Sequence, residues 1–287
     1  MEPAGCANLQ SVSARYVIPA AVLLAVCLLP GPGLDAAATN PLAREIQKTE
    51  EYFPDEIGSV WRYKGRSRTD AVERVSEVVF ANEVSAIGTT NIKGETVKIF
   101  RETNQGNKGP ADGFFRRDKA GITYYGSLPT TPFEQQLIPY QVLVFPLVME
   151  GTFRQLERKD VDMKADLDGD GRHEHADVVA DVRVSAHTPV TVPAGTFSDA
   201  IQIDASMTIV ITLTKSGRVI TSRDRITSWF VRGIGLVKYV EEVESPPVME
   251  TRGEVTHVSE ELESYTLKGT VGAPSAPVLP PQSADRL

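Results

Sequence analysis

The sequence predicts an all-β, mainly antiparallel protein built on a curved sheet, with at most one or two short helices near its N-terminal end. Short runs of alternating or β-branched residues follow one another from Ser59 onward, and such runs are typical of strands that are buried on one face. Glycine-containing turns join the clearest of them. With 287 residues, 41% apolar and 24% charged, the chain can bury one large core or two modest ones.

The first element of the chain is an apolar segment that predicts export. Residues Val17 to Leu29 form an apolar run too short to span a bilayer; Arg15 precedes this run and Ala36-Ala37-Ala38 follows it. This is the layout of a signal peptide. We therefore expect residues 1–38 to be removed, and the mature chain, with no transmembrane helix, to reach the periplasm, the cell envelope or the medium.

Both cysteines, Cys6 and Cys27, lie in this segment. The mature chain is therefore predicted to have no disulfide and no thiolate ligand. Lipid anchoring at Cys27, as in bacterial lipoproteins, would require a small residue just before the cysteine, where Val26 stands. We therefore do not expect an anchor.

After the cleavage site, Asn40-Pro41 predicts a short helix over Leu42 to Lys48, because asparagine caps helices and proline suits the first helical position. The runs beyond it are expected to be strands: Val60 to Tyr63, Val72 to Phe80, Thr96 to Arg101, Gly113 to Arg117, Ile122 to Tyr125, Arg158 to Met163, Val178 to Ser185 and Ala200 to Ala205.

The clearest hairpin joins Met207 to Thr214 with Val219 to Ile226 through a turn that contains Gly217. Trp229 to Val243 is expected to supply a further strand pair, with Gly233 and Gly235 at its turn. Residues 269–287 are rich in proline, alanine and serine. This composition predicts a disordered tail.

A faint internal repeat runs through the predicted β-rich domain, residues 39–268. The motif Phe53-Pro54-x3-Gly58-x2-Trp61 is echoed by Phe145-Pro146-x4-Gly151-x-Phe153. Two related halves, residues 50–143 and 144–268, would explain the repeat. Chance recurrence of turn and strand residues explains it equally well.

Four motifs carry a resemblance to a known family: Tyr52-Phe53-Pro54-x3-Gly58-x2-Trp61-x-Tyr63, Thr191-Val192-Pro193-Ala194-Gly195-Thr196-Phe197, Trp229-x3-Gly233-Ile234-Gly235-Leu236-Val237-Lys238 and Glu261-Leu262-Glu263-Ser264-Tyr265. With these motifs the chain resembles, over residues 50–268, a family of uncharacterised exported bacterial proteins, often lipoproteins, that is sometimes called TapB-like. The resemblance implies a β-rich fold, a half-barrel akin to lipoprotein carrier domains. It implies no catalytic residues.

The residues with the clearest chemistry form an acidic loop. Three carboxylates alternate and a glycine follows the third, as in a twelve-residue EF-hand-like calcium loop. In that numbering the first, third, fifth, seventh and twelfth positions are Asp166, Asp168, Asp170, Arg172 (through its carbonyl) and Asp177. Because the flanking segments alternate as strands, we expect the loop to join two strands and either Glu174 or Asp177 to complete a structural calcium site.

Two other interpretations of this region remain open. Aspartate and glycine favour turns for backbone reasons alone, so the loop could bind nothing. Unneutralised repulsion between its carboxylates argues against an empty loop. Alternatively, His173, His175 and Asp177 alternate, and two histidines with one carboxylate can bind Fe²⁺ or Zn²⁺. Solvated loop histidines are the simpler explanation.

The net charge and the absence of known catalytic motifs argue against several classes of function. The formal net charge is −8 and no basic patch is present, which argues against nucleic acid as a partner. The sequence has no Gly-x-Ser-x-Gly, no Walker loop and no His-Glu-x-x-His. We therefore expect a non-enzymatic exported or envelope protein that binds a lipid, another apolar ligand or a protein partner, with calcium stiffening one loop. The alternatives are a calcium-stabilised adhesion module and a metal-dependent enzyme that uses the two histidines.

Overall fold

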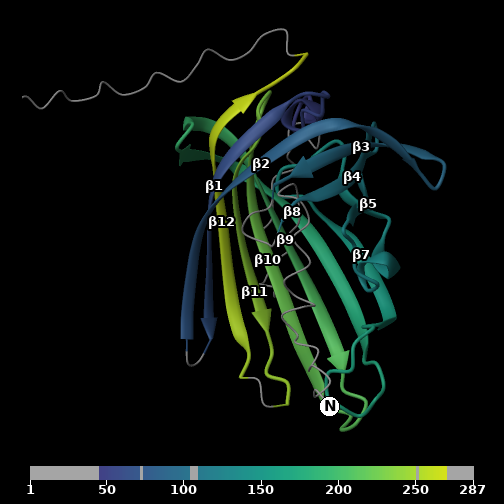
Figure 1. Cartoon of the computed structure of the whole chain (residues 1–287). Coiled ribbons are helices and arrows are strands. Elements are labelled where there is room, and N and C mark those ends of the chain that lie inside the picture. The colour runs from purple at the N-terminus through teal and green to yellow at the C-terminus, as the bar shows by residue number, and fades with distance from the viewer. Residues whose placement is uncertain (1–44, 72–73, 104–108, 250–251, 270–287) are drawn as a thin grey trace, which may run out of the picture.

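The computed structural model describes residues 45–71, 74–103, 109–249 and 252–269 (Figure 1). The expected signal peptide and the expected tail beyond Gly269 lie outside these residues. One 12-stranded sheet accounts for most of the described chain. Its strands are β1 (Val60–Ala71), β2 (Arg74–Ile92), β3 (Glu95–Glu102), β4 (Ala111–Asp118), β5 (Gly121–Leu128), β6 (Tyr140–Val144), β7 (Thr152–Asp162), β8 (His175–Val192), β9 (Gly195–Thr212), β10 (Val219–Val231), β11 (Gly235–Ser245) and β12 (Glu254–Thr266).

The sheet is a nearly closed barrel with one open seam. Its strand order is β6-β5-β4-β3-β2-β1-β12-β11-β10-β9-β8-β7, and every neighbouring pair is antiparallel. All ladders join strands that are consecutive in the chain except the ladder between β1 and β12, which runs from Val60 opposite Thr266 to Ala71 opposite Glu254. The prediction of an all-β, antiparallel curved sheet is confirmed, and the sheet curves further than a half-barrel.

The seam lies between β6 and β7, and side chains bridge it where backbone bonds do not. Gln155 Nε2 donates to the carbonyl oxygen of Val142 at 3.3 Å, and Arg158 Nη2 donates to that of Leu137 at 3.3 Å. Gln136 contributes a third bond, of 2.8 Å, to the carbonyl of Asp162. Polar side chains therefore satisfy carbonyl oxygens on both edge strands, those of Val142 and Asp162, and also link β7 to the segment that precedes β6.

In the described residues, two short helices accompany the sheet, η2 (Thr49–Tyr52) and α2 (Glu134–Leu137). The helix expected over Leu42 to Lys48 is wrong in its described part, residues 45–48. Glu45 forms an isolated bridge with Val148, and Ile46 donates its backbone N–H to the carbonyl of Leu147 at 2.8 Å. This extended pairing buries Ile46 in the core and outweighs the local helix signal.

The inward-facing residues of the strands fill one large core. From Ile201 to Ile211, β9 alternates buried and half-buried residues, as a strand with one core face must. Gly65 on β1 is needed for close packing, because a Cβ there would stand 2.2 Å from the ring of Phe80 on the paired strand β2. The core continues toward both ends of the barrel, where the candidate sites lie.

Candidate functional site

A segment that we call the strap, residues Ile46 to Asp55, crosses one end of the barrel (top of Figure 1). The turn between β10 and β11 holds it from one side. Gly233 donates its backbone N–H to the carbonyl of Glu51 at 2.8 Å, and Arg232 Nη2 donates to the carbonyl of Gln47 at 3.0 Å.

Arg117 of β4 holds the strap from the other side. Its guanidinium donates to the carbonyl oxygens of Phe53 at 2.5 Å and Glu50 at 3.2 Å, and to Asp55 Oδ1 at 2.5 Å. Lys98 Nζ lies 3.6 Å from the other carboxylate oxygen of Asp55. The carboxylate of Asp55 is buried between two cations, which satisfies its charge.

An aromatic cavity of about 90 Å³ lies beneath the strap. Its walls come mainly from aromatic side chains, namely Tyr52, Phe53, Trp61, Tyr63, Phe100, Phe115 and Phe230. The rings of Phe53 and Phe230 stand 4.8 Å apart, and those of Phe100 and Phe115 meet edge to face at 5.8 Å.

The polar atoms of two of the three amphipathic rings in this wall, Trp61 and Tyr63, have hydrogen-bond partners, whereas the hydroxyl of the third, Tyr52, is buried without one. Trp61 Nε1 donates to the carbonyl oxygen of Ile234 at 2.6 Å, and the Tyr63 hydroxyl donates to that of Leu236 at 3.0 Å. These rings therefore offer the cavity mainly their apolar surfaces.

A second, wider cleft of about 460 Å³ is lined by Glu45 and the first part of the strap, Ile46 to Glu50, together with Phe145 and Pro146. Arg117 lines both spaces. Ligand pockets generally measure about 300–1,000 Å³. The cleft falls in this range, whereas the aromatic cavity is smaller.

Further inside the barrel lies a group that the sequence analysis missed. We call it the acidic belt: Glu102, Asp224, Glu241 and Glu260, on β3, β10, β11 and β12. Asn82 on β2 bridges two of them, with its Nδ2 3.3 Å from Glu102 Oε2 and 3.1 Å from Glu260 Oε2. These four acids lie far apart from one another in the sequence, so no motif indicates that they converge.

Burial raises the pKa of every carboxyl group in the belt. The pKa of Glu102 rises to about 8, through burial first and the nearby Glu260 second. Burial raises the pKa of Glu260 to about 7, although the hydrogen bond from Asn82 opposes this shift. The pKa of Asp224 also rises to about 7, and that of Glu241 is raised through burial and repulsion from Asp224.

The acidic loop lies at the opposite end of the barrel from the strap (Figure 1). It packs on the turn that follows β9, whereas the strap packs on the turn that follows β10. Since β10 has 13 residues, the two ends are roughly 40 Å apart along the strand.

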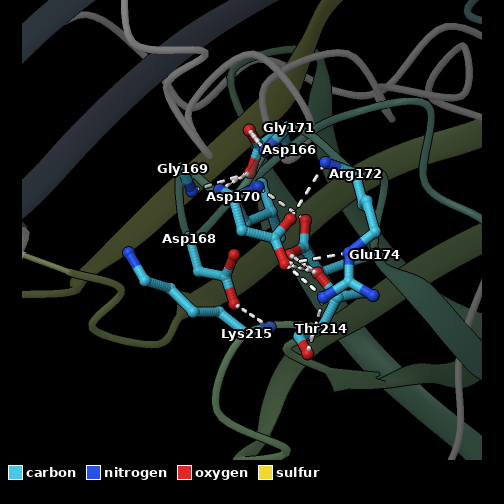
Figure 2. A network of polar contacts seen from close by, with 10 residues as sticks. Asp166, Asp168, Gly169, Asp170, Gly171, Arg172, Glu174, Thr214 and Lys215 are labelled. Atoms are coloured by element: carbon cyan, nitrogen blue, oxygen red, sulfur yellow. Dashed lines mark hydrogen bonds and ion pairs between the residues drawn. The ribbon is translucent and has the colours of Figure 1, made fainter.

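Three carboxylates of the loop converge (Figure 2). One oxygen each from Asp166, Asp168 and Glu174 lies within 4.8 Å of the others. Asp166 accepts backbone N–H bonds from Gly169, Asp170 and Gly171, and the bond from Gly171 is the largest cause of its lowered pKa.

The other two carboxylates are buried. Glu174 is 0% exposed and accepts the backbone N–H of Leu167 at 2.5 Å, and burial raises its pKa. Asp168 is 6% exposed; its Oδ2 accepts the backbone N–H of Lys215 at 2.8 Å, while its Oδ1 is buried with no hydrogen-bond partner. A hard cation such as Ca²⁺ fits this set, because it takes oxygen ligands and would satisfy the orphaned oxygen.

The other predicted ligands lie outside this convergent group. Asp170 Oδ2 accepts hydrogen bonds from the Arg172 side chain at 2.6 Å and from Thr214 Oγ1 at 3.1 Å. Asp177 lies on β8, where it forms an ion pair of 2.9 Å with Lys159. The geometry therefore favours Glu174 over Asp177 as the residue that completes the group.

The two histidines do not join Asp177. His173 Nδ1 lies 3.1 Å from Asp162 Oδ1, and His175 Nδ1 lies 2.9 Å from Asp160 Oδ1. Among the described residues, the only group of three or more metal-ligating side chains is Asp166, Asp168 and Glu174. The metal-dependent enzyme expected as an alternative thus has no assembled centre in this part of the chain.

Comparisons with known proteins give a distant likeness. No family model and no curated protein matches the sequence. A crystal structure of a "putative lipoprotein" from Parabacteroides distasonis is 15% identical, with a TM-score of 0.34, and the match covers 75% of this chain and 98% of that one. A "putative exported protein with YmcC-like fold" from Bacteroides fragilis is 12% identical, with a TM-score of 0.32 and the same coverage.

The TapB-like resemblance stays a prediction, since no family model matches. Within the described residues, no helix is both long enough and apolar enough to cross a bilayer.

Proposed function

We propose that this protein is an exported, non-enzymatic binding protein that holds an apolar ligand in the aromatic cavity under the strap. The observation that supports the proposal most is the cavity itself, whose wall is largely aromatic and whose Trp61 and Tyr63 polar atoms already have partners. Burial of apolar ligand surface against such a wall is favourable. The signal-peptide layout of residues 1–38 supports export.

Ligand entry is expected to require movement of the strap. Its attachment to β4 depends on one side chain, Arg117, and on the ion pairs of Asp55. Release of these contacts would join the cavity to the neighbouring cleft. Water can replace the polar contacts that hold the strap at little cost, whereas exposure of the aromatic side chains to water is unfavourable. The strap is therefore the element that can open.

A fluorescent fatty-acid probe tests this function. We expect saturable binding that unlabelled fatty acid competes away. Val84 lines the cavity from β2, so Val84→Phe should reduce the probe affinity about tenfold or more by filling space. Val79→Phe, at an exposed position of the same strand, is the matched control and should bind normally. The wild-type protein refutes the proposal if, at micromolar concentration, it binds neither this anionic probe nor an uncharged alkyl ligand such as octanol in a saturable way.

We further propose that Asp166, Asp168 and Glu174 hold a structural calcium ion. Calcium at about 100 times its dissociation constant should add about 2.7 kcal/mol to the free energy of unfolding. For a chain of this size that corresponds to a rise in Tm of about 5 to 10 °C over the value in EDTA. Differential scanning calorimetry in millimolar calcium and in EDTA measures this shift.

Two isosteric variants separate the candidate ligands. Asp168→Asn keeps an acceptor for the Lys215 N–H but loses the charge, so it should abolish the calcium shift. Asp177→Asn removes only the partner of Lys159 and should keep the shift. The reverse result would place the ion at Asp177, and identical melting curves of the wild-type protein in calcium and in EDTA would mean that the loop is only a turn.

A further inference from the structure

We propose that the acidic belt is the polar end of the ligand site, and that the preferred ligand is an apolar amine. Its ammonium group would lie among the carboxyl groups of the belt, and its hydrocarbon part would contact the aromatic cavity. This inference rests on the proposed function and names the chemical class of the ligand.

The carboxyl groups of the belt cluster inside the barrel without a buried cationic side chain. Glu102, Glu241 and Glu260 are buried, and no lysine, arginine or histidine is among the buried side chains of the described residues. The cations closest to the cavity, Lys98 and Arg117, are both engaged by Asp55 on the strap. A ligand that brings its own positive charge would therefore complement the belt.

An orphaned oxygen points independently to a missing donor. Glu102 is 1% exposed; its Oε2 accepts a bond from Asn82, and its Oε1 is buried without any hydrogen-bond partner. Asp224 Oδ1 and Ser228 Oγ, on β10, are also buried without partners. An ammonium group carries three donors and no acceptor, so it matches a site with surplus acceptors.

Tyr63 connects the cavity with the belt. Its ring is part of the cavity wall, and Glu260 and Glu102 lie close enough to raise the pKa of its hydroxyl, after burial as the main cause. In the β1–β2 ladder Tyr63 stands opposite Asn82, the residue that bridges the two glutamates. An amine that passes the aromatic wall therefore meets the belt next, and aromatic faces themselves attract ammonium groups.

Other ligand classes fit less well. A divalent metal needs several carboxylate oxygens close together, and among the described residues only the acidic loop provides a group of three. A neutral alcohol supplies one donor but leaves the charge of an ionised carboxylate uncompensated. An acyl anion would be repelled by the belt once its groups ionise.

Amine binding should displace protons. The titratable side chains that face one another in the belt are Glu102, Asp224, Glu241 and Glu260, together with the hydroxyls of Tyr63 and Tyr239. Since burial keeps a large share of the carboxyl groups protonated near neutral pH, an incoming ammonium ion favours the ionised form of the carboxyl group that it contacts. One proton then leaves that carboxyl group for the buffer for each ammonium bound.

The test compares octylamine with octanol by isothermal titration calorimetry at pH 7. An alkylamine is fully protonated there, as a lysine side chain is. We expect octylamine to bind tenfold or more tightly than octanol, since a hydrogen bond to a charged group is stronger than a neutral one. Titration in two buffers of different ionisation enthalpy should show proton release with octylamine and none with octanol.

Two variants and one control test whether the belt causes the preference for octylamine over octanol. Glu102→Gln and Glu260→Gln keep the shape of the belt and should reduce the preference for octylamine at least fivefold each. Glu263→Gln, on the same strand as Glu260 but exposed and paired with Lys64, should leave the preference unchanged. This inference is overturned if octanol binds as tightly as octylamine, or if both variants keep the preference for octylamine. Either result would still be compatible with an apolar ligand in the aromatic cavity. Failure of octanol, octylamine and the fatty-acid probe alike overturns the proposed function as well.

Discussion

Raising the pH from about 5 to about 9 should lower the free energy of unfolding by several kcal/mol, because the buried acids of the belt must ionise. Their pKa values in the folded protein, about 8 for Glu102 and about 7 for Glu260 and Asp224, lie above the ordinary value of 4.5 or less. Between these limits the native state holds more protons than the unfolded chain, so stability falls as the pH rises. One pKa unit corresponds to about 1.4 kcal/mol, which makes this a large effect even for one residue.

Urea unfolding at a series of pH values measures this decline. Glu102→Gln should flatten the curve between about pH 6 and 9, because glutamine cannot ionise. Glu263→Gln should not change its shape, since this residue is exposed. At low pH a second loss is expected, because carboxylates with lowered pKa values, such as Asp166 and Asp177, become protonated. A profile that stays level from pH 6 to pH 9 would mean that the belt is hydrated and ionised already.

Trp61→Ala should lower the free energy of unfolding by about 3–5 kcal/mol, the range found when large buried aromatic residues are truncated. The Trp61 side chain is 4% exposed, its ring packs 6.4 Å from that of Phe100, and its Nε1–H satisfies the carbonyl of Ile234. The truncation removes this packing and leaves a larger cavity under the strap. Urea unfolding at fixed pH measures the loss.

Trp61→Phe is the matched control and should lose about 1–2 kcal/mol, mainly from the unsatisfied carbonyl of Ile234. The enlarged cavity of Trp61→Ala should also admit small aromatic molecules, as engineered apolar cavities of about 150 Å³ do. A loss below about 1 kcal/mol for Trp61→Ala would show that the strap collapses into the space, and that the cavity is not rigidly built.

Residue alternation predicted much of the sheet, because most strands have one apolar face. The separate runs Ala200 to Ala205 and Met207 to Thr214 proved to be mostly a single strand, β9. The strand β12 was missed for a physical reason. Its inner face carries Glu260 between Val258 and Leu262, so a buried acid interrupts the apolar periodicity on which the prediction depends.

The candidate sites were predictable to different degrees. The acidic loop is visible in the sequence because its aspartates are close together, but the residue that completes it depends on strand register. Glu174 is turned into the loop, whereas Asp177 has entered β8 and faces Lys159. The cavity contains residues of the family motifs, among them Phe53, Trp61 and Gly235. The belt brings together one acidic residue from each of four strands, and no local sequence pattern predicts that these residues lie close together.

The pairing of β1 with β12 determines when the barrel can form. Every other ladder is a hairpin between consecutive strands, whereas this one joins Val60 to Thr266. Ladders between distant segments form slowly, because closing a long loop costs chain entropy before any stabilising contact is made. If the proposed export carries the chain across a membrane from its N-terminus onward, the chain emerges as a row of hairpins. It becomes a barrel only when its last strand arrives, so loss of β12 should leave one six-stranded and one five-stranded meander with exposed edges and a strong tendency to aggregate.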